Sequence, residues 1–182
     1  MIDEICKYNK EFTEKNNYTE YITGKYPSKK LAILTCMDTR LTELLPAALG
    51  LKNGDAKIIK NAGGIISHPY GSVVRSLLIA ILKLKVEEIM VIGHTDCGVQ
   101  GLDGEDLLSL LIQRGVSTEK IAGLEKEGID FRAWLDGFDS TEGAVADAVT
   151  VLKEHPLIPG DIIIRGFVMD SVTGKLQEVD VK

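Results

Sequence analysis

Short aliphatic runs alternate along this chain with longer segments that have helical periodicity. The runs at 31–35, 56–60, 88–93 and 161–167 are centred on Ile, Leu and Val and have the length of strands. Such runs, without regular polar alternation, are typical of strands buried on both faces of a sheet. A weaker run at 175–179, which follows a Thr-Gly turn, suggests a further strand at an edge.

Apolar residues between these runs recur at the spacing of helices that face a core. The clearest case follows Pro69 and predicts a helix over 70–81. Its core-facing positions are expected to be Tyr70, Val73, Val74, Leu77, Leu78 and Ile81.

Weaker signals predict other helices. A helix over 42–49 would tolerate Pro46 only near its first turn, and Gly50 would end it. Thr141 resembles an N-cap for a helix that ends before Pro156. Two more helices are predicted in the charged, glycine-punctuated segment between these, near 104–114 and 117–126.

The N-terminal residues 2–16 predict an amphipathic helix, followed by a polar loop at 25–30. A compact α/β core does not need the apolar face of this helix. We therefore expect the helix to pack on a second subunit, which would make the protein a homodimer or a higher homo-oligomer. The residues at near-helical spacing are Ile2, Ile5, Cys6, Asn9 and Phe12.

Strands that alternate with helices predict a parallel sheet covered on both faces, because parallel strands need crossover connections and these are normally helical. The expected fold is a single three-layer α/β domain over 1–182, with a mostly parallel central sheet of 4–5 strands flanked by helices. Within it, 1–24 would form an N-terminal helical arm and 30–182 the α/β core. No internal repeat or long linker suggests a second domain.

Composition and charge exclude several classes of function. With 182 residues, 45% of them hydrophobic, the chain can bury a core without disulfides or other staples. Its net charge of −6 and lack of a Lys/Arg cluster argue against nucleic acid or an anionic membrane as a partner. The longest apolar stretch, 77–82, is far shorter than the ~18 residues of a membrane span, and residues 1–18 lack a signal-peptide core. A cytoplasmic protein is expected.

Candidate chemistry lies where predicted strands end. Cys36 follows the run at 31–35, and His94 and Cys97 follow the run at 88–93, at the edge where open α/β sheets bind ligands. Two thiolates and one imidazole suit zinc. A lone Cys in such a place is more often a small buried hydrophobe. A third ligand at an equivalent strand end, with a carboxylate and a guanidinium beside it, favours a metal site. Cys6 has no partner motif and is not assigned to a site.

Three ligands leave one coordination position of a tetrahedral zinc open for water, which zinc can convert to hydroxide near neutral pH. Asp38 and Arg40 stand at alternate positions of what reads as an extended segment after Cys36, so all three side chains are expected to point the same way. Asp38 could orient the water or become the fourth ligand in a closed state. A solvated surface ion pair is the plainer interpretation of this Asp and Arg taken alone.

His68 and His155 each adjoin a proline and have no ligand partner nearby, so we interpret both as loop residues. A role for His68 in proton transfer is the less favoured alternative.

The motifs Cys-Met-Asp-Thr-Arg at 36–40 and His-Thr-Asp-Cys-Gly at 94–98 are similar to the paired signatures of the β-class carbonic anhydrases, and Asn-Ala-Gly at 61–63 matches as well. The correspondence runs from about residue 30 to the final strand, and the short length resembles the compact clade of prokaryotes and archaea. Thr39 stands where Ser is frequent, and Gly64 where other small residues are common. The Gln and aromatic pocket residues of plant-type members have no evident counterpart.

The resemblance implies a zinc lyase, a carbonate dehydratase, that reversibly hydrates CO2 to bicarbonate and a proton through a zinc-bound hydroxide. It implies Zn²⁺ held by Cys36, His94 and Cys97, a catalytic dyad of Asp38 and Arg40, and a homodimer as the basic unit. Two alternatives remain open: a carbonyl sulfide or carbon disulfide hydrolase with the same zinc centre, or a catalytically silent zinc-binding homologue in which Asp38 permanently blocks the metal.

Overall fold

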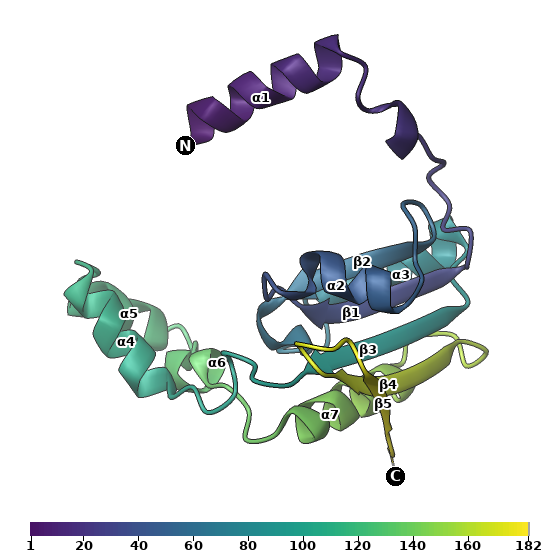
Figure 1. The fold of residues 1–182 in the computed structure, drawn as a ribbon. Helices are drawn as coiled ribbons and strands as arrows, with labels where there is room; N and C mark the ends of the chain where they lie inside the picture. The colour runs from purple at the N-terminus through teal and green to yellow at the C-terminus, as the bar shows by residue number, and fades with distance from the viewer. Residues whose placement is uncertain (182) are drawn as a thin grey trace.

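The computed structural model describes residues 1–181 and contains one five-stranded sheet in that range, in the order β2-β1-β3-β4-β5 (Figure 1). The first four strands along the chain pair in parallel, and the last pairs antiparallel at an edge. The mostly parallel α/β sheet predicted from the sequence is therefore confirmed, and its strands number five. Their bounds are β1 Leu31–Cys36, β2 Ala56–Asn61, β3 Glu88–His94, β4 Ile163–Met169 and β5 Leu176–Val179.

Helices cover both faces of this sheet and also extend beyond it. Helices α3 and α7 pack on one face and α2 packs on the other, which gives the three layers that the sequence predicts (Figure 1). The bounds are α1 Ile2–Glu14, α2 Leu41–Ala48, α3 Ser72–Leu84, α4 Gly104–Gln113, α5 Thr118–Glu125, α6 Phe131–Leu135 and α7 Thr141–Lys153. No helix among the described residues combines the length and apolar character needed to cross a bilayer.

The alternation of side chains along β1 supplies both apolar layers. Ala32 and Leu34 belong to the cluster beneath α3 and α7, whereas Ile33 belongs to the cluster beneath α2. All three are fully buried. Burying a Leu or Ile side chain contributes roughly 1.5–3 kcal/mol to the free energy of folding. A strand buried on both faces is therefore held firmly in place, and it fixes the position of the residue at its end.

A tight turn after β2 packs directly against the end of β1. Gly64 in this turn has a φ of +66°, and a Cβ added there would lie 2.9 Å from the backbone nitrogen of Cys36. Glycine is therefore required at position 64 for two reasons. The backbone there is left-handed, and a second chain segment approaches too closely for a side chain. The sequence alone marked this position only as a mild departure.

The Gly64→Ala variant is expected to lower the free energy of unfolding by about 1–3 kcal/mol, because the added methyl group meets backbone that cannot rotate away. Urea denaturation would measure the change. Gly123→Ala in α5 is the matched control, since no atom lies within 4 Å of its added Cβ. The control should leave stability unchanged or raise it by up to ~1 kcal/mol. Equal stabilities of the two variants would contradict this account.

Four helices between residues 103 and 153 begin at a side chain that accepts a backbone N–H, as N-cap residues do. The sequence located α4 and α5 but missed the short α6. It also placed the cap of α7 one residue too late. Ser140 is the N-cap, and its Oγ accepts from the amide of Gly143 at 3.0 Å. The neighbouring Thr141 is the first helical residue, and its buried hydroxyl donates to the carbonyl of His94 at 3.3 Å.

Two other sequence predictions need correction. Pro46 lies in the second turn of α2, not in its first. Burial of Leu41 and Leu45 against the sheet stabilises that short helix despite the hydrogen bond that a proline cannot donate. Tyr70 was expected to face the core from α3, but α3 begins at Ser72 and Tyr70 is exposed.

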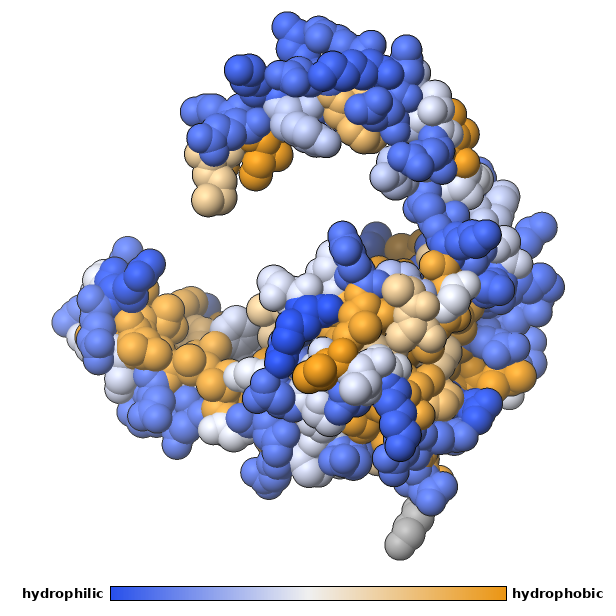
Figure 2. Space-filling model, viewed as in Figure 1, coloured by the Kyte–Doolittle hydropathy of each residue, from blue (hydrophilic) through white to orange (hydrophobic). Residues whose placement is uncertain are grey.

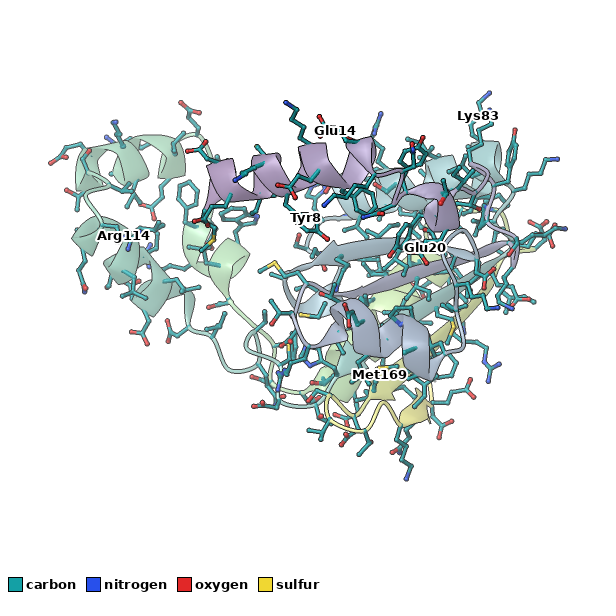
Figure 3. The ribbon with its side chains drawn as sticks, turned by 45° about the horizontal axis from the view of Figure 1, so that its top comes forward. Tyr8, Glu14, Glu20, Lys83, Arg114 and Met169 are labelled. Atoms are coloured by element: carbon teal, nitrogen blue, oxygen red, sulfur yellow. The ribbon has the colours of Figure 1, made fainter. Side chains whose placement is uncertain are left out.

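Helix α1 stands away from the sheet, and none of its residues is buried. Figure 2 shows its apolar side facing open space, with a second apolar surface on the α4–α5 helices across the gap. Figure 3, which labels Tyr8 and Glu14, shows the side chains of α1 projecting around the helix. Several of the exposed apolar side chains lie on these helices, namely Ile2, Ile5, Tyr8, Leu110, Leu111, Ile112 and Leu124.

Candidate metal centre

Two adjacent parallel strands place a thiol and an imidazole at the same edge of the sheet. Cys36 is the last residue of β1 and His94 the last of β3. These strands pair in parallel, with Thr35 opposite Ile92, so both ends lie at the carboxyl edge. This is the edge where ligands bind in open α/β sheets.

A tight turn after β3 returns Cys97 to the same point. Thr95 still donates its amide to the carbonyl of Met169 at 3.0 Å, which continues the pairing with β4. The chain then reverses at Asp96, whose φ of +54° is left-handed. Aspartate is one of the few residues other than glycine that adopt this conformation readily. The backbone carbonyl of Cys97 accepts a hydrogen bond from the amide of Gln100 at 3.1 Å, which fixes the end of the turn.

The three side chains form a buried cluster. The sulfurs of Cys36 and Cys97 and a ring nitrogen of His94 all lie within 4.8 Å of one another. The two Sγ atoms are 3.8 Å apart. Two thiolates that bind one tetrahedral zinc at the usual Zn–S distance are separated by roughly 3.8 Å. The spacing of the two sulfurs therefore fits a zinc ion.

His94 presents one ring nitrogen to this cluster with its lone pair free. Its Nδ1 lies 2.9 Å from the carbonyl oxygen of Thr95, which can only accept, so Nδ1 carries the proton. Its Nε2 is buried and has no hydrogen-bond partner among the described residues. A buried polar atom without a partner is costly unless something binds it. A metal ion would satisfy Nε2, and the Nδ1 contact is of the kind that orients metal-binding histidines.

The thiols also favour a cation. Burial raises the pKa of the Cys97 thiol, and the neighbouring Cys36 raises it further. Two thiolates in one buried site would repel each other unless a positive charge lay between them. A divalent cation supplies that charge, which is why metal binding to such sites displaces the thiol protons.

Beside the cluster, Asp38 and Arg40 form a bidentate ion pair. Arg40 donates from Nε to Oδ1 of Asp38 at 3.0 Å and from Nη2 to Oδ2 at 2.8 Å. The backbone amide of Arg40 also donates to Oδ1, at 2.8 Å. The segment is not extended, as the sequence suggested, because the amide of Leu41 turns back to the carbonyl of Asp38. A turn, and not strand alternation, brings the two side chains together.

This pair places an ionised carboxylate next to the cluster. The hydrogen bonds donated by the Arg40 side chain hold the pKa of Asp38 well below its usual range, although partial burial opposes them. The same contacts, with those to Asp96, raise the pKa of Arg40 above its ordinary value. Oδ2 of Asp38 lies 3.9 Å from Nε2 of His94. The carboxylate is thus close to the position that a metal would occupy and is held by Arg40.

A sequence model of the carbonic anhydrase family matches residues 31–176, which include every residue of this site. The chain belongs to the β-class carbonic anhydrase family. In Bacillus subtilis, the protein named "Putative carbonic anhydrase YtiB" is 47% identical over 97% of this chain and 94% of its own length. The carbon disulfide hydrolase of an Acidianus strain is 31% identical, over 86% of this chain and 80% of its own.

Solved structures in the family share the fold. The β-carbonic anhydrase isoform I of Trichomonas vaginalis superposes with a TM-score of 0.87 at 32% identity, and the match covers 98% of this chain and 97% of that one. The fold of this family member therefore agrees with an experimental structure along nearly its whole length.

The structure also shows a contact of this family member that the sequence did not suggest. In the sequence, Asp96 is notable only as part of the His-Thr-Asp-Cys-Gly motif, yet its carboxylate accepts a hydrogen bond from Nη1 of Arg40 at 2.7 Å. The one available signal was its place between His94 and Cys97, where a reversal of the chain calls for a residue that tolerates a left-handed backbone.

The remaining histidines and Cys6 lie outside the cluster. His155 is buried, and both ring nitrogens have partners: Nε2 lies 2.9 Å from the carbonyl of Pro69, and Nδ1 accepts from the amide of Leu157 at 3.2 Å. His68 is exposed, and its Nδ1 accepts from the amide of Tyr70. Cys6 is an exposed free thiol on α1. These contacts agree with structural roles for the two histidines.

Proposed function

We propose that this chain is a zinc lyase that reversibly hydrates CO2 to bicarbonate and a proton. Cys36, His94 and Cys97 would hold the metal. The observation that carries the proposal is the buried, unpartnered Nε2 of His94 beside two thiols spaced for a zinc ion. Bound there, zinc would lower the pKa of a coordinated water and so supply a nucleophile near neutral pH.

Asp38 and Arg40 would control that nucleophile. With its pKa held low, Asp38 is an acceptor for a hydrogen bond and not a donor, and its Oδ2 faces the cluster. It would orient the attacking oxygen toward the carbon of CO2. Arg40 would hold the carboxylate in that orientation and keep it from acting as a fourth ligand. Family membership and this geometry together support the assignment of a catalytic dyad.

The test is stopped-flow CO2 hydration by the zinc-loaded protein, followed with a pH indicator, beside consumption of carbonyl sulfide and carbon disulfide. Substantial CO2 hydration with little turnover of the sulfur compounds is expected. The likeness to a carbon disulfide hydrolase keeps that activity as a second candidate, and rapid carbon disulfide turnover with slow CO2 hydration would favour it. Zinc binding without activity on any of the three would indicate a silent homologue.

We further propose that residues 1–24 form an arm, attached to the zinc-binding core at 30–182, that packs on a second copy of this chain. The support is that α1 is amphipathic yet buries no residue in one copy. Ile5, for example, lies on the apolar side of this helix and is 62% exposed. Apolar positions along a helix gain most of their stabilisation from packing on a partner. The homodimer would be the basic unit.

The Ile5→Glu variant is therefore expected to shift the protein toward monomer, because it places a charge in the proposed contact. Light scattering at micromolar protein concentration would measure the change. Lys7→Gln is a matched control, since it alters the net charge by the same amount on the opposite, polar side of α1. A wild-type monomer, or equal dissociation of the two variants, would contradict the proposed packing.

A further inference from the structure

The guanidinium of Arg40 joins the two loops that carry the metal-binding side chains. One edge binds Asp38, which follows β1. The other side binds Asp96, which follows β3, through Nη1 to Oδ2 and through Nη2 to the backbone carbonyl, both at 2.7 Å. Arg40 is thus hydrogen-bonded to the residue before Cys97 as well as to the carboxylate beside the cluster.

The two aspartates do not compete for the same hydrogen atoms. A guanidinium has five N–H donors in a planar fork. The Asp38 carboxylate uses Nε and one hydrogen of Nη2, and Asp96 uses Nη1 and leaves the second hydrogen of Nη2 for its carbonyl. Asp96 therefore adds restraint to Arg40 without weakening its bonds to Asp38.

The backbone at Asp96 makes this restraint stiff. Its φ of +54° belongs to the tight turn between His94 and Cys97, and the amide of Thr95 before it is tied to β4. The carbonyl that accepts from Arg40 is part of that turn. An arginine held in this way would lose its hydrogen bonds to Asp96 if it followed a carboxylate that moved toward the cluster.

We propose that Asp96 is a positioning residue that anchors Arg40 to the turn after β3 and thereby keeps Asp38 off the metal. The proposal rests on the metal site proposed above. If Arg40 were free on its outer side, it could move with Asp38 and keep both hydrogen bonds while the carboxylate bound the metal. Because Arg40 is anchored, Asp38 must give up those bonds to reach the metal, so the open state is favoured.

The alternative is that Asp96 and Arg40 form an ordinary surface ion pair. The side chain of Asp96 is 85% exposed, and exposed pairs usually contribute little to stability. In that case only the negative charge of Asp96 would matter near the metal. Its removal would then strengthen the binding of an anion at the metal, whereas loss of a positioning contact would weaken it, because Asp38 would occupy the site more often.

The two accounts therefore predict opposite changes in anion affinity when the Asp96 side chain is replaced. Thiocyanate would be titrated at constant pH into protein loaded with Co²⁺, and the visible absorption of the metal would report binding. The proteins would be wild type, Asp96→Asn, Asp38→Ala and the double variant. Asparagine tolerates the left-handed backbone but lacks the charge. Asp139→Asn is the control for loss of an exposed carboxylate, because Asp139 is exposed and its carboxylate has no arginine partner among the described residues.

We expect Asp96→Asn to raise the Kd of thiocyanate about two- to fivefold, the range that a contact between exposed charges can supply. The same substitution should have no effect in the Asp38→Ala background, where no carboxylate can reach the metal. Asp96→Gly, which also accepts the left-handed backbone, should behave like Asp96→Asn and guards against a defect peculiar to one variant. Asp139→Asn should match wild type.

Unchanged or tighter thiocyanate binding in both Asp96 variants would overturn the proposal, and so would an equal weakening with and without Asp38. The titration needs no turnover, so a protein that is inactive on CO2 can still confirm or refute the role of Asp96. A wild-type protein that binds no Co²⁺ at all would instead refute the metal site and, with it, the proposed role of Asp96.

Discussion

Loss of any one of Cys36, His94 or Cys97 is expected to remove most of the bound zinc and, with it, CO2 hydration. Changes to residues that only orient a metal ligand already lower metal affinity ~10–100-fold. Removal of a ligand itself should cost at least as much. Cys36→Ser, His94→Ala and Cys97→Ser should each reduce affinity by more than ~100-fold on this scale, because three protein ligands leave no spare donor in the cluster.

Elemental analysis of protein dialysed against a weak chelator would measure zinc per chain, and circular dichroism would show that each variant still folds. Cys6→Ser is the matched control, because Cys6 is an exposed thiol on α1. It should retain the zinc content of wild type. Full zinc occupancy in all three ligand variants would remove the basis of the proposed function.

The second large effect is expected at Asp38. Asp38→Ala should lower the rate of CO2 hydration by about 10²–10⁴-fold, as the loss of a well-placed proton acceptor commonly does. Zinc should remain bound, because Asp38 lies beside the cluster and not within it. Arg40→Ala should also lower activity with zinc retained, since a carboxylate released from its bidentate partner can reach the metal.

The double variant separates this coupled action from two independent effects. With no carboxylate left to restrain, loss of Arg40 should add little, so the double variant should resemble Asp38→Ala alone. The steady-state rate of CO2 hydration and the zinc content of all four proteins would be measured between about pH 6.5 and 9. This range includes the pKa of ~7 that is typical of zinc-bound water. Losses that simply multiply, or an Arg40→Ala protein as active as wild type, would rule out the coupling and leave the zinc assignment untouched.

Asp38 itself should not contribute to the pH dependence in that range. Its pKa is lowered in the folded protein, chiefly by hydrogen bonds from Arg40. A lowered carboxyl pKa contributes stability above the unfolded value, and this contribution is lost only as the pH falls through the folded value. Asp38 is therefore ionised throughout neutral pH, and any rise of activity toward alkaline pH must come from another group.

The main strands and their order along the chain were predictable because strands buried on both faces of a parallel sheet are nearly continuous runs of aliphatic residues. The aliphatic run before Cys36 and the run before His94 are both typical of such buried strands. The residue types that suit zinc were equally evident at the ends of these runs. Helix α3 was predicted for the same reason, since its core face repeats with helical period.

Helix boundaries were less predictable where two neighbouring residues are equally good N-caps. Ser140 and Thr141 are both good N-caps, and the structure uses the serine as the cap while the threonine hydroxyl donates to the carbonyl of His94. Helix α6 is only five residues long, too short for a periodic signal. The need for glycine at position 64 depends on the backbone of Cys36, which comes from a distant part of the chain.

By itself, the sequence determined the α/β class, the approximate elements and the chemical character of the site, because periodicity and residue type are local properties. Only the tertiary structure decided which atoms meet. It placed β1 beside β3, so that Cys36 comes within 3.8 Å of Cys97 in sulfur-to-sulfur distance. It also brought Asp96 to Arg40, 56 residues away along the chain. Such contacts depend on strand order and on the direction of two turns, and these are settled by packing between distant segments.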